Sequence, residues 1–212
     1  GMYYGGATNC TFTGNTASYD GGGMRGGTAV NCTFTGNSAS DTSGGMYLGT
    51  ATNCIFWGNG SDEVDGTIVR YSCLSVTTAG EGHIIADPKW VNPWEGNFRL
   101  QADSPCIDTG TPSDAPGDDI LGRTRPQGSG IDMGAYEYYP GDDVGAVDTP
   151  IIHVNAASTA ENPDGLSWET AFPTLQAGAD RAGYGAEIWV VEGTYTAAVG
   201  DSVVSLKPVT MV

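Results

Sequence analysis

The sequence predicts an all-β fold built around a right-handed parallel β-helix, a solenoid with coils of about 22 residues. Four sequence markers recur at this spacing through three copies without an insertion. A period in the twenties indicates a solenoid, because one copy cannot bury its apolar face alone and must stack on its neighbours. The markers are Gly1-Met2, Gly23-Met24 and Gly45-Met46; Asn9-Cys10, Asn31-Cys32 and Asn53-Cys54; Phe12, Phe34 and Phe56; and Gly14-Asn15, Gly36-Asn37 and Gly58-Asn59.

Each copy contains a short run whose polarity alternates as in a half-buried strand. The alternation predicts an inward face, on which like residues stack about 4.8 Å apart as Cys and Phe ladders. Asn residues are expected to form a ladder on the outward face, and Gly-Asn pairs to form the turns. Fixed leucines and helical spacing are both missing, which argues against a leucine-rich repeat. The inward sets are Thr8, Cys10, Phe12; Val30, Cys32, Phe34; and Thr52, Cys54, Phe56, and the outward sets are Asn9, Thr11, Thr13; Asn31, Thr33, Thr35; and Ile55, Trp57.

Two copies also carry paired motifs that resemble a known repeat. Gly44-Gly45-Met46 with Phe56-Trp57-Gly58-Asn59, and Gly22-Gly23-Met24 with Phe34-Thr35-Gly36-Asn37, resemble the GGA(I/L/V) and FxxN motifs of the polymorphic outer-membrane protein repeat. Met replaces the Ala-aliphatic pair of that family. The resemblance covers residues 1 to about 60 and implies a surface-exposed β-helical adhesin.

Residues 1–86 are assigned to coils, which become irregular at 67–74 and 80–85. In residues 87–138, Ser104-Pro105-Cys106-Ile107-Asp108 and Ile131-Asp132-Met133-Gly134-Ala135-Tyr136-Glu137 resemble the closing segment of secreted bacterial β-helix proteins, including those with the choice-of-anchor Q domain. The resemblance implies an irregular C-terminal cap over the open strand edges of the last coil.

The charged residues of this cap have two interpretations. Arg123 and Arg125 lie near Asp118, Asp119 and Asp132 in the sequence, which favours a buried Arg–Asp clamp. The alternative is a Ca²⁺ site, the only cofactor expected, although the spacing of the acids lacks an EF-hand pattern. The Ca²⁺ candidates are Asp114, Asp118 and Asp119.

Residues 139–150 have the composition of an acidic linker with Pro and Gly. Residues 151–212 resemble the opening of the same class of β-helix, with a cap helix and first coils. Strands are expected at 151–155 and 187–191 and in 203–212. A helix is expected to begin near Ser167, with Phe172, Leu175, Ala179 and Ala182 on its apolar face.

The five cysteines do not show a metal pattern, because a C-x-x-C spacing is missing. Cys10, Cys32 and Cys54 lie in register, and Cys73 is expected to extend their ladder. Free, buried thiols are favoured there, because in-register Cβ vectors are parallel and fit the disulfide dihedral poorly. Cys106 stands apart and can pair if it reaches the end of the ladder.

Three sequons begin at Asn9, Asn31 and Asn59. Their side chains are expected to point outward, so glycosylation is sterically possible.

The net charge is −17, with 8 Lys plus Arg against 25 Asp plus Glu. This balance excludes nucleic acid and anionic membranes as partners. No stretch approaches the length of an apolar membrane span. We therefore expect an extracellular or cell-surface protein that does not insert into membranes.

The regular coils offer few residues for catalysis. In residues 1–60 the acids are Asp20 and Asp41, and Arg25 is the only base. A polysaccharide lyase or hydrolase needs a carboxylate pair, or Ca²⁺ with a base, so an enzyme is disfavoured. The alternative to a structural role is a non-catalytic carbohydrate-binding module that binds surface glycans, with sugars stacked on Tyr3, Tyr47 and Trp57.

The order of the segments favours assembly. The middle and end of a β-helix come first and the start of one comes last, which predicts two open sheet edges. We expect copies of the chain to join head-to-tail by strand addition, as a subunit or tandem repeat unit of an extracellular filament or adhesive fibre. The same contact would join units of a covalent array. The interface candidates are Met2, Tyr4, Cys10, Phe12, Val203, Val204, Leu206, Val209, Met211 and Val212.

Overall fold

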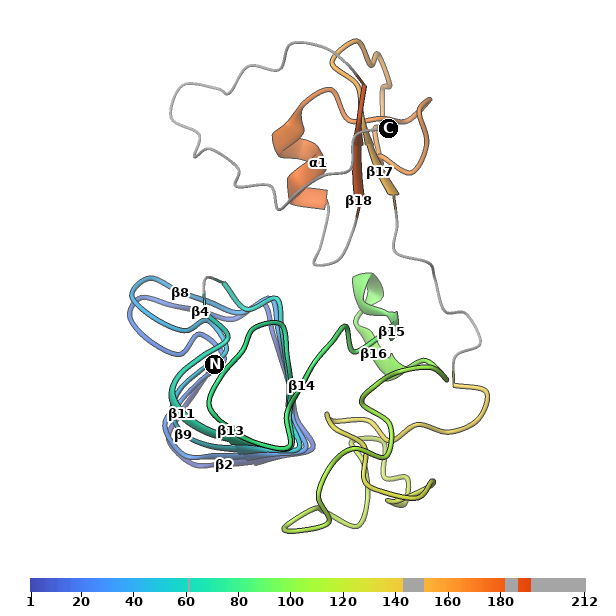
Figure 1. Cartoon of the computed structure of the whole chain (residues 1–212). Coiled ribbons are helices and arrows are strands. Elements are labelled where there is room, and N and C mark those ends of the chain that lie inside the picture. Colours follow the sequence, from blue (N-terminus) through green and yellow to red (C-terminus); the bar gives the residue numbers. More distant parts are fainter. Residues whose placement is uncertain (61, 143–150, 182–186, 192–212) are drawn as a thin grey trace. The chain divides into compact units, whose positions relative to one another are not determined.

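The computed structural model describes residues 1–60, 62–142, 151–181 and 187–191 (Figure 1). The chain divides into two compact units, Gly1–Ala146 and Val147–Val212. The described residues are nearly all β, and α1 (Leu175–Arg181) is their only α-helix. None of the helices described is both long enough and apolar enough to cross a membrane.

The first unit is a parallel β-solenoid, as predicted, and its coils stack one behind another (Figure 1). Three parallel sheets run along the stack. The seven-stranded sheet comprises β1 (Met2–Tyr3), β5 (Met24–Arg25), β9 (Met46–Thr52), β11 (Val64–Arg70) and β13 (Gly80–Glu81), with β2 (Gly6–Thr8) and β6 (Thr28–Val30). The five-stranded sheet comprises β3 (Thr11–Thr13), β7 (Thr33–Thr35), β10 (Ile55–Trp57), β12 (Cys73–Leu74) and β14 (Ile84–Ile85), and the third sheet pairs β4 (Thr16–Ala17) with β8 (Ser38–Ala39).

The coils shorten along the stack. Met2 pairs with Met24 and Met24 with Met46, so the first two steps keep the full period of the sequence repeat. The third step is shorter, because Met46 pairs with Val64, whereas the full period would bring it to Ile68. The fourth step is shorter again, since Val69 pairs with Gly80. The irregular coils expected at 67–74 and 80–85 are therefore present as shortened coils that keep the parallel register.

The phenylalanines form the central stack of the core. The ring centroids of Phe12 and Phe34 lie 4.6 Å apart with an interplanar angle of 4°, and those of Phe34 and Phe56 lie 4.6 Å apart at 10°. The cysteine positions also belong to this core. The inward direction predicted for the Phe and Cys ladders is confirmed.

The inward position predicted for Thr8, Val30 and Thr52 is wrong. Ala7, Ala29 and Ala51 occupy the core instead. The reason is that the expected single strand breaks at the corner asparagines Asn9, Asn31 and Asn53, which adopt positive φ angles of 51°, 47° and 54°. A left-handed corner residue inserts one position into the alternation, so residues before the corner shift by one face.

The residues after the coils form what we term the flanking segment, residues 87–142. It begins with an antiparallel hairpin of β15 (Trp90–Asn92) and β16 (Asn97–Leu100), joined through the 3₁₀-helix η1 (Pro93–Glu95). The remainder is irregular. The segment lies beside the five-stranded sheet (Figure 1).

The cap was expected over the open edge of the last coil, but the segment runs along the side of the coils. Its backbone carbonyls accept hydrogen bonds from the corner asparagines of three successive coils: Asp118 from Asn9, Asp132 from Asn31, and Thr111 from Asn53. The outward-facing side chains of Ile55 and Cys73 supply the apolar surface that this segment buries. Among the described residues, β13 and β14 pair with a strand on one side only.

The second unit has the parallel strands expected there. β17 (Ile151–Val154) pairs with β18 (Glu187–Val190), and Ile152, Val154 and Ile188 form a small core with Phe172 and Leu175. The helix α1 begins at Leu175 and not near Ser167. Thr174 caps α1 by accepting a hydrogen bond from Ala177 N, while the Ser167 hydroxyl accepts one from Thr170 N in a separate turn. The strands expected in 203–212 lie outside the described residues.

We predict that Phe34→Ala lowers the free energy of unfolding by about 3–5 kcal/mol. The ring is fully buried and stacked on both sides. Denaturant unfolding measures the loss. Phe12→Ala is the matched control, because Phe12 is half-buried and has a stacked ring on one side, and its loss should be smaller. A loss below about 1 kcal/mol for Phe34→Ala would contradict the stacked core.

Candidate functional site

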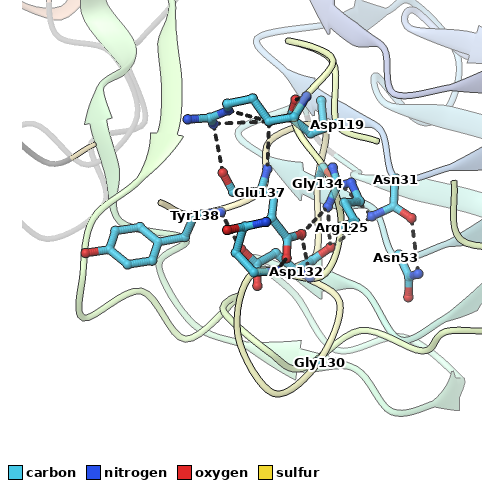
Figure 2. Close-up of polar contacts among 12 residues, drawn as sticks. Asn31, Asn53, Asp119, Arg125, Gly130, Asp132, Gly134, Glu137 and Tyr138 are labelled. Carbon is cyan, nitrogen blue, oxygen red and sulfur yellow. Dashed lines mark hydrogen bonds and ion pairs between the residues drawn. The ribbon is translucent and has the colours of Figure 1, made fainter. Parts of the chain in front are cut away.

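A buried network of charged side chains lies within the flanking segment, next to the coils (Figure 2). At its centre Arg125 Nη1 donates to Glu137 Oε2 over 2.8 Å, and both side chains have no solvent exposure. Arg125 Nη2 donates to the carbonyl oxygen of Gly134 over 2.9 Å. Removing one partner from such a buried pair typically costs about 3–5 kcal/mol, because the other charge is left unpaired.

A second carboxylate, Asp132, lies beside this pair. Its Oδ1 accepts a hydrogen bond from Asp108 N over 2.8 Å and its Oδ2 accepts one from Tyr138 N over 2.6 Å. Burial raises the pKa of Asp132 to about 7. The two backbone donors and Arg125 act against this rise, and the charge of Glu137 adds to it.

Arg123 forms the outer part of the network. It pairs with Asp119 at 3.1 Å and with Asp142 at 2.8 Å, and its guanidinium lies 4.2 Å from the ring centroid of Tyr139. Burial alone would raise the pKa of Asp119. The backbone N–H groups of Arg123 and Glu137 and the Arg123 side chain together lower that pKa.

The network meets the solenoid at two shared carbonyl groups. The oxygens of Asp132 and Gly134 each accept hydrogen bonds from Arg125 and from the Asn31 side chain (Figure 2). Asn53 Nδ2 in turn donates to Asn31 Oδ1 over 3.2 Å. The arrangement is therefore a clamp: the buried charges hold the backbone loop that binds the corner asparagines.

The clamp predicted from the sequence is present, with a different acidic partner for Arg125. That partner is Glu137, and Asp132 contributes mainly through its backbone carbonyl and through its contacts to Asp108 and Tyr138. Sequence reasoning missed Glu137. The available signal was its place as an acid within the otherwise apolar run Met133-Gly134-Ala135-Tyr136.

The Ca²⁺ candidates do not converge on one site. Asp114 and Asp118 are exposed, while Asp119 is buried and its two carboxylate oxygens accept hydrogen bonds from Leu121 N, Arg123 and Glu137 N. Within the part of the chain that the structure describes, no group of three or more His, Cys, Asp or Glu side chains is placed to hold a metal ion.

Two of the three aromatic candidates come together on the outer face of the seven-stranded sheet. Tyr3, Arg25 and Tyr47 are register partners on successive coils. The Arg25 guanidinium lies 5.3 Å from the Tyr3 ring centroid and 5.5 Å from that of Tyr47, and it also pairs with Asp20 at 3.5 Å. Trp57 is elsewhere, on the five-stranded sheet, where it packs against the flanking segment.

The sequon asparagines are not freely exposed. Asn31 and Asn59 are buried, and Asn9 is half-buried and donates to the carbonyl of Asp118 over 2.6 Å. Asn59 Nδ2 donates to Phe34 O and to Glu63. Asn9 and Asn31 point out of the coil as expected, but the flanking segment binds them. A glycan on Asn31 or Asn59 of the folded chain would have to break these contacts.

The candidate interface of the first coil lies at the end of the core. Met2, Cys10 and Phe12 are partly buried and pack against it, and Tyr4 is exposed. The other interface candidates (Val203, Val204, Leu206, Val209, Met211 and Val212) lie outside the described residues.

No family model matches this chain, and no match was found among the curated proteins or the solved structures compared with it. The resemblances to the polymorphic outer-membrane protein repeat and to the choice-of-anchor Q segment therefore gain no support from these comparisons. The structure itself shows the coarser class, a parallel β-solenoid with a laterally clamped segment.

We predict that Asp132 makes the first unit less stable as pH rises from about 4 to about 7. Because burial raises the pKa of Asp132 to about 7, the folded chain keeps a proton that the unfolded chain releases near its ordinary pKa of 3.8. Stability from this group is thus complete at low pH and is lost as pH approaches 7. Asp132→Asn cannot ionise, so the stability difference between wild type and variant should change by about 2–4 kcal/mol between about pH 4.5 and about pH 8.

Denaturant unfolding at the two pH values measures this difference. The matched control is Asp114→Asn, which removes an exposed carboxylate of the same segment and is measured at the same two pH values. An equal offset for Asp132→Asn at both pH values would show that Asp132 is ionised in the folded chain throughout.

Proposed function

We propose that this chain is a structural unit of an extracellular filament or adhesive surface fibre, joined head-to-tail by strand addition. One observation supports this above the others: the coils stack in parallel, and the flanking segment binds the side of the stack and not its end. Within the described residues β1, β3 and β4 each pair on one side only, with β5, β7 and β8. Open edges of parallel strands are templates for further strands.

The hydrogen-bond pattern identifies the groups that are open on this edge. Cys10 O accepts from Thr33 N over 2.9 Å, and Gly14 N donates to Thr35 O over 3.2 Å. Because backbone groups alternate in direction along a strand, those of Thr11 and Thr13 face away from the second coil. A strand added at this edge would bind there.

The second unit supplies a donor of the matching type. Its parallel pair β17–β18, with α1 packed against both strands, is the kind of structure that starts a coil. We propose that residues Val203–Val212 of one chain extend this unit onto the first coil of the next. Such a contact is heterologous and propagates into an open fibre. It would equally join consecutive units of a covalent tandem array.

Two carboxylates of the coils, Asp20 and Glu63, support a structural role over glycoside cleavage. Asp20 pairs with Arg25 and accepts from the Thr42 hydroxyl. Glu63 is buried and accepts hydrogen bonds from Gly58, Asn59 and Ser75. These acids are engaged within the fold, whereas a glycosidase needs two carboxyl groups facing a substrate groove. The strongly acidic composition fits the proposed extracellular location.

We predict that the purified chain forms linear assemblies visible by negative-stain electron microscopy, and that Thr11→Pro suppresses them. Proline removes the N–H group that faces the open edge. Thr11→Ala keeps that group and is the matched control. Deletion of residues 203–212 should abolish assembly in the same way. A chain that stays monomeric at high concentration, or a Thr11→Pro variant that assembles as well as Thr11→Ala, would refute the proposal.

The aromatic ladder favours a second candidate function, binding of surface glycans. Tyr3, on the first coil, is 70% exposed. Tyr47 lies on the third coil, and Arg25 lies between the two rings on the second. Aromatic faces at regular spacing can stack against sugar rings, and Arg25 and Asp20 provide hydrogen-bonding groups beside them.

We predict that Tyr47→Ala lowers affinity for a bound glycan roughly 2–10-fold, the effect of losing about 0.5–1.5 kcal/mol of ring contact. A glycan array followed by calorimetry on the ligands it detects measures this. Tyr19→Ala is the control, because Tyr19 is equally exposed (71%) but lies outside the ladder. An array without binding would remove this candidate function.

A further inference from the structure

Two of the five cysteines lie in one buried cluster at the boundary between the coils and the flanking segment. Cys73 belongs to β12 of the fourth coil, and Cys106 belongs to the irregular part of the flanking segment. Both are fully buried in one apolar cluster with Ile55, Leu100 and Met133.

Backbone contacts fix the positions of both residues. Cys73 is the register partner of Ile55. The position opposite Cys54, where the ladder would continue, is occupied by Ser72, whose hydroxyl accepts a hydrogen bond from Cys54 N over 3.0 Å. The expectation that Cys73 extends the ladder is therefore wrong. The fourth coil starts earlier than the sequence repeat predicts, and its cysteine arrives on the outer face of the sheet.

Cys106 approaches this outer face from the flanking segment. Its carbonyl accepts a hydrogen bond from Met133 N over 3.0 Å. The residue after Met133, Gly134, lies so close to Ile55 that an added Cβ would come within 2.6 Å of the Ile55 Cδ1 atom. The Cys73 thiol donates to the carbonyl oxygen of Ala86 over 3.1 Å. Burial and, next to it, the neighbouring Cys73 thiol raise the pKa of Cys106.

The thiols of the ladder are arranged differently. Cys10, Cys32 and Cys54 project from in-register parallel strands, and each donates to the carbonyl two positions earlier in the chain, at 3.2–3.3 Å. Parallel Cβ vectors fit poorly with the dihedral angle near 90° that a disulfide requires. Cys73 and Cys106 come from the two sides of one interface and lie in the same buried cluster.

We propose that Cys73 and Cys106 form a disulfide bond in an oxidising environment, which ties the flanking segment covalently to the fourth coil. The oxidant is a low-molecular-weight disulfide. The Cys73 thiolate attacks one of its sulfurs and releases one thiolate, and the Cys106 thiolate then attacks the Cys73 sulfur and releases the second. Two protein thiols are oxidised, one small disulfide is reduced to two thiols, and the two protons pass to the released thiolates.

Because both cysteines are buried in the folded chain, this bond has to form before folding is complete. Burial raises the pKa of Cys106, so the closed interface disfavours the thiolate that the exchange needs. Oxidation therefore takes place while the interface is still open during folding, and the closed interface then excludes reductants. The bond closes a loop between positions 73 and 106, and it holds the flanking segment independently of the asparagine contacts. This inference does not depend on the proposed fibre.

Intact mass spectrometry of the full 212-residue chain tests the proposal. The chain is refolded with either a reductant or oxidised glutathione, then unfolded in denaturant and alkylated. Five cysteines should be alkylated in the reduced sample and three in the oxidised sample, and a non-reducing digest should contain the Cys73–Cys106 peptide pair. The oxidised chain should unfold at a temperature roughly 5–10 °C higher than the reduced chain.

Two substitutions separate this pair from the ladder. Cys106→Ser should abolish the change in alkylation and in unfolding temperature, whereas Cys10→Ser, the control at the partly exposed end of the ladder, should keep both. Alkylation of all five cysteines after oxidation, glutathione adducts without an internal bond, or a bond among Cys10, Cys32 and Cys54 would each overturn the proposal. If Cys106→Ser does not fold, the masses and peptides of the wild-type chain still decide the matter.

Discussion

The structure of the first unit depends on the asparagine at one corner of each of the first three coils. Asn9, Asn31 and Asn53 adopt the left-handed backbone conformation that turns the chain from one sheet into the next. A glycine could make the same turn without strain. The asparagine side chain adds a second role, because its amide donates out of the coil to a carbonyl of the flanking segment. One residue type therefore both turns the coil and binds the flanking segment, and this explains why the corner ladder is asparagine.

The ion pair of Arg125 and Glu137 stabilises this contact, because it holds the loop that carries the acceptor carbonyls in place. Arg125 and Asn31 both donate hydrogen bonds to the carbonyls of Asp132 and Gly134.

A second asparagine ladder explains how a carboxylate comes to be buried among the coils. Asn15 Nδ2 donates to Asn37 Oδ1 over 2.8 Å, and Asn37 Nδ2 donates to Asn59 Oδ1 over 2.7 Å. The third coil is shortened, so no asparagine follows, and Glu63 accepts the last amide over 2.6 Å. Glu63 also accepts from the backbone of Gly58 and Asn59 and from the Ser75 hydroxyl. A buried carboxylate is tolerated when donors surround it, and here the directional ladder delivers those donors. Glu63 therefore has a structural role at the end of the regular repeat, where it accepts the last hydrogen bond of the asparagine ladder.

The repeat made the solenoid and its core predictable, and the misses have local physical causes. Phe34 and Cys32 were placed correctly because a constant period puts like residues in register. Thr8 was placed on the wrong face because a left-handed corner inserts one residue into the alternation, and that conformation is invisible to a two-residue period. Cys73 was misassigned because the third step is shorter than the period, which places Cys73 opposite Ile55 and not opposite Cys54. The pairing of Glu137 with Arg125 could not be predicted, because it depends on how an irregular loop folds back. The sequence separation of two residues in such a loop does not indicate whether they meet. The α1 helix starts later than expected because Thr174 provides a cap after Pro173.

The lateral position of the flanking segment bears directly on assembly. A cap placed over the last coil would supply partners for β13 and β14 and would end the stack. The observed segment binds the corner asparagines and the outer face of the five-stranded sheet, and it leaves both strands paired on one side among the described residues. It therefore buries the apolar outer residues Ile55 and Cys73 without occupying the direction in which coils stack. A solenoid whose stabilising segment lies beside the coils can be both independently stable and open to stacking along its axis. That combination is what a head-to-tail structural unit requires, and it is the physical reason why we favour this role for the chain.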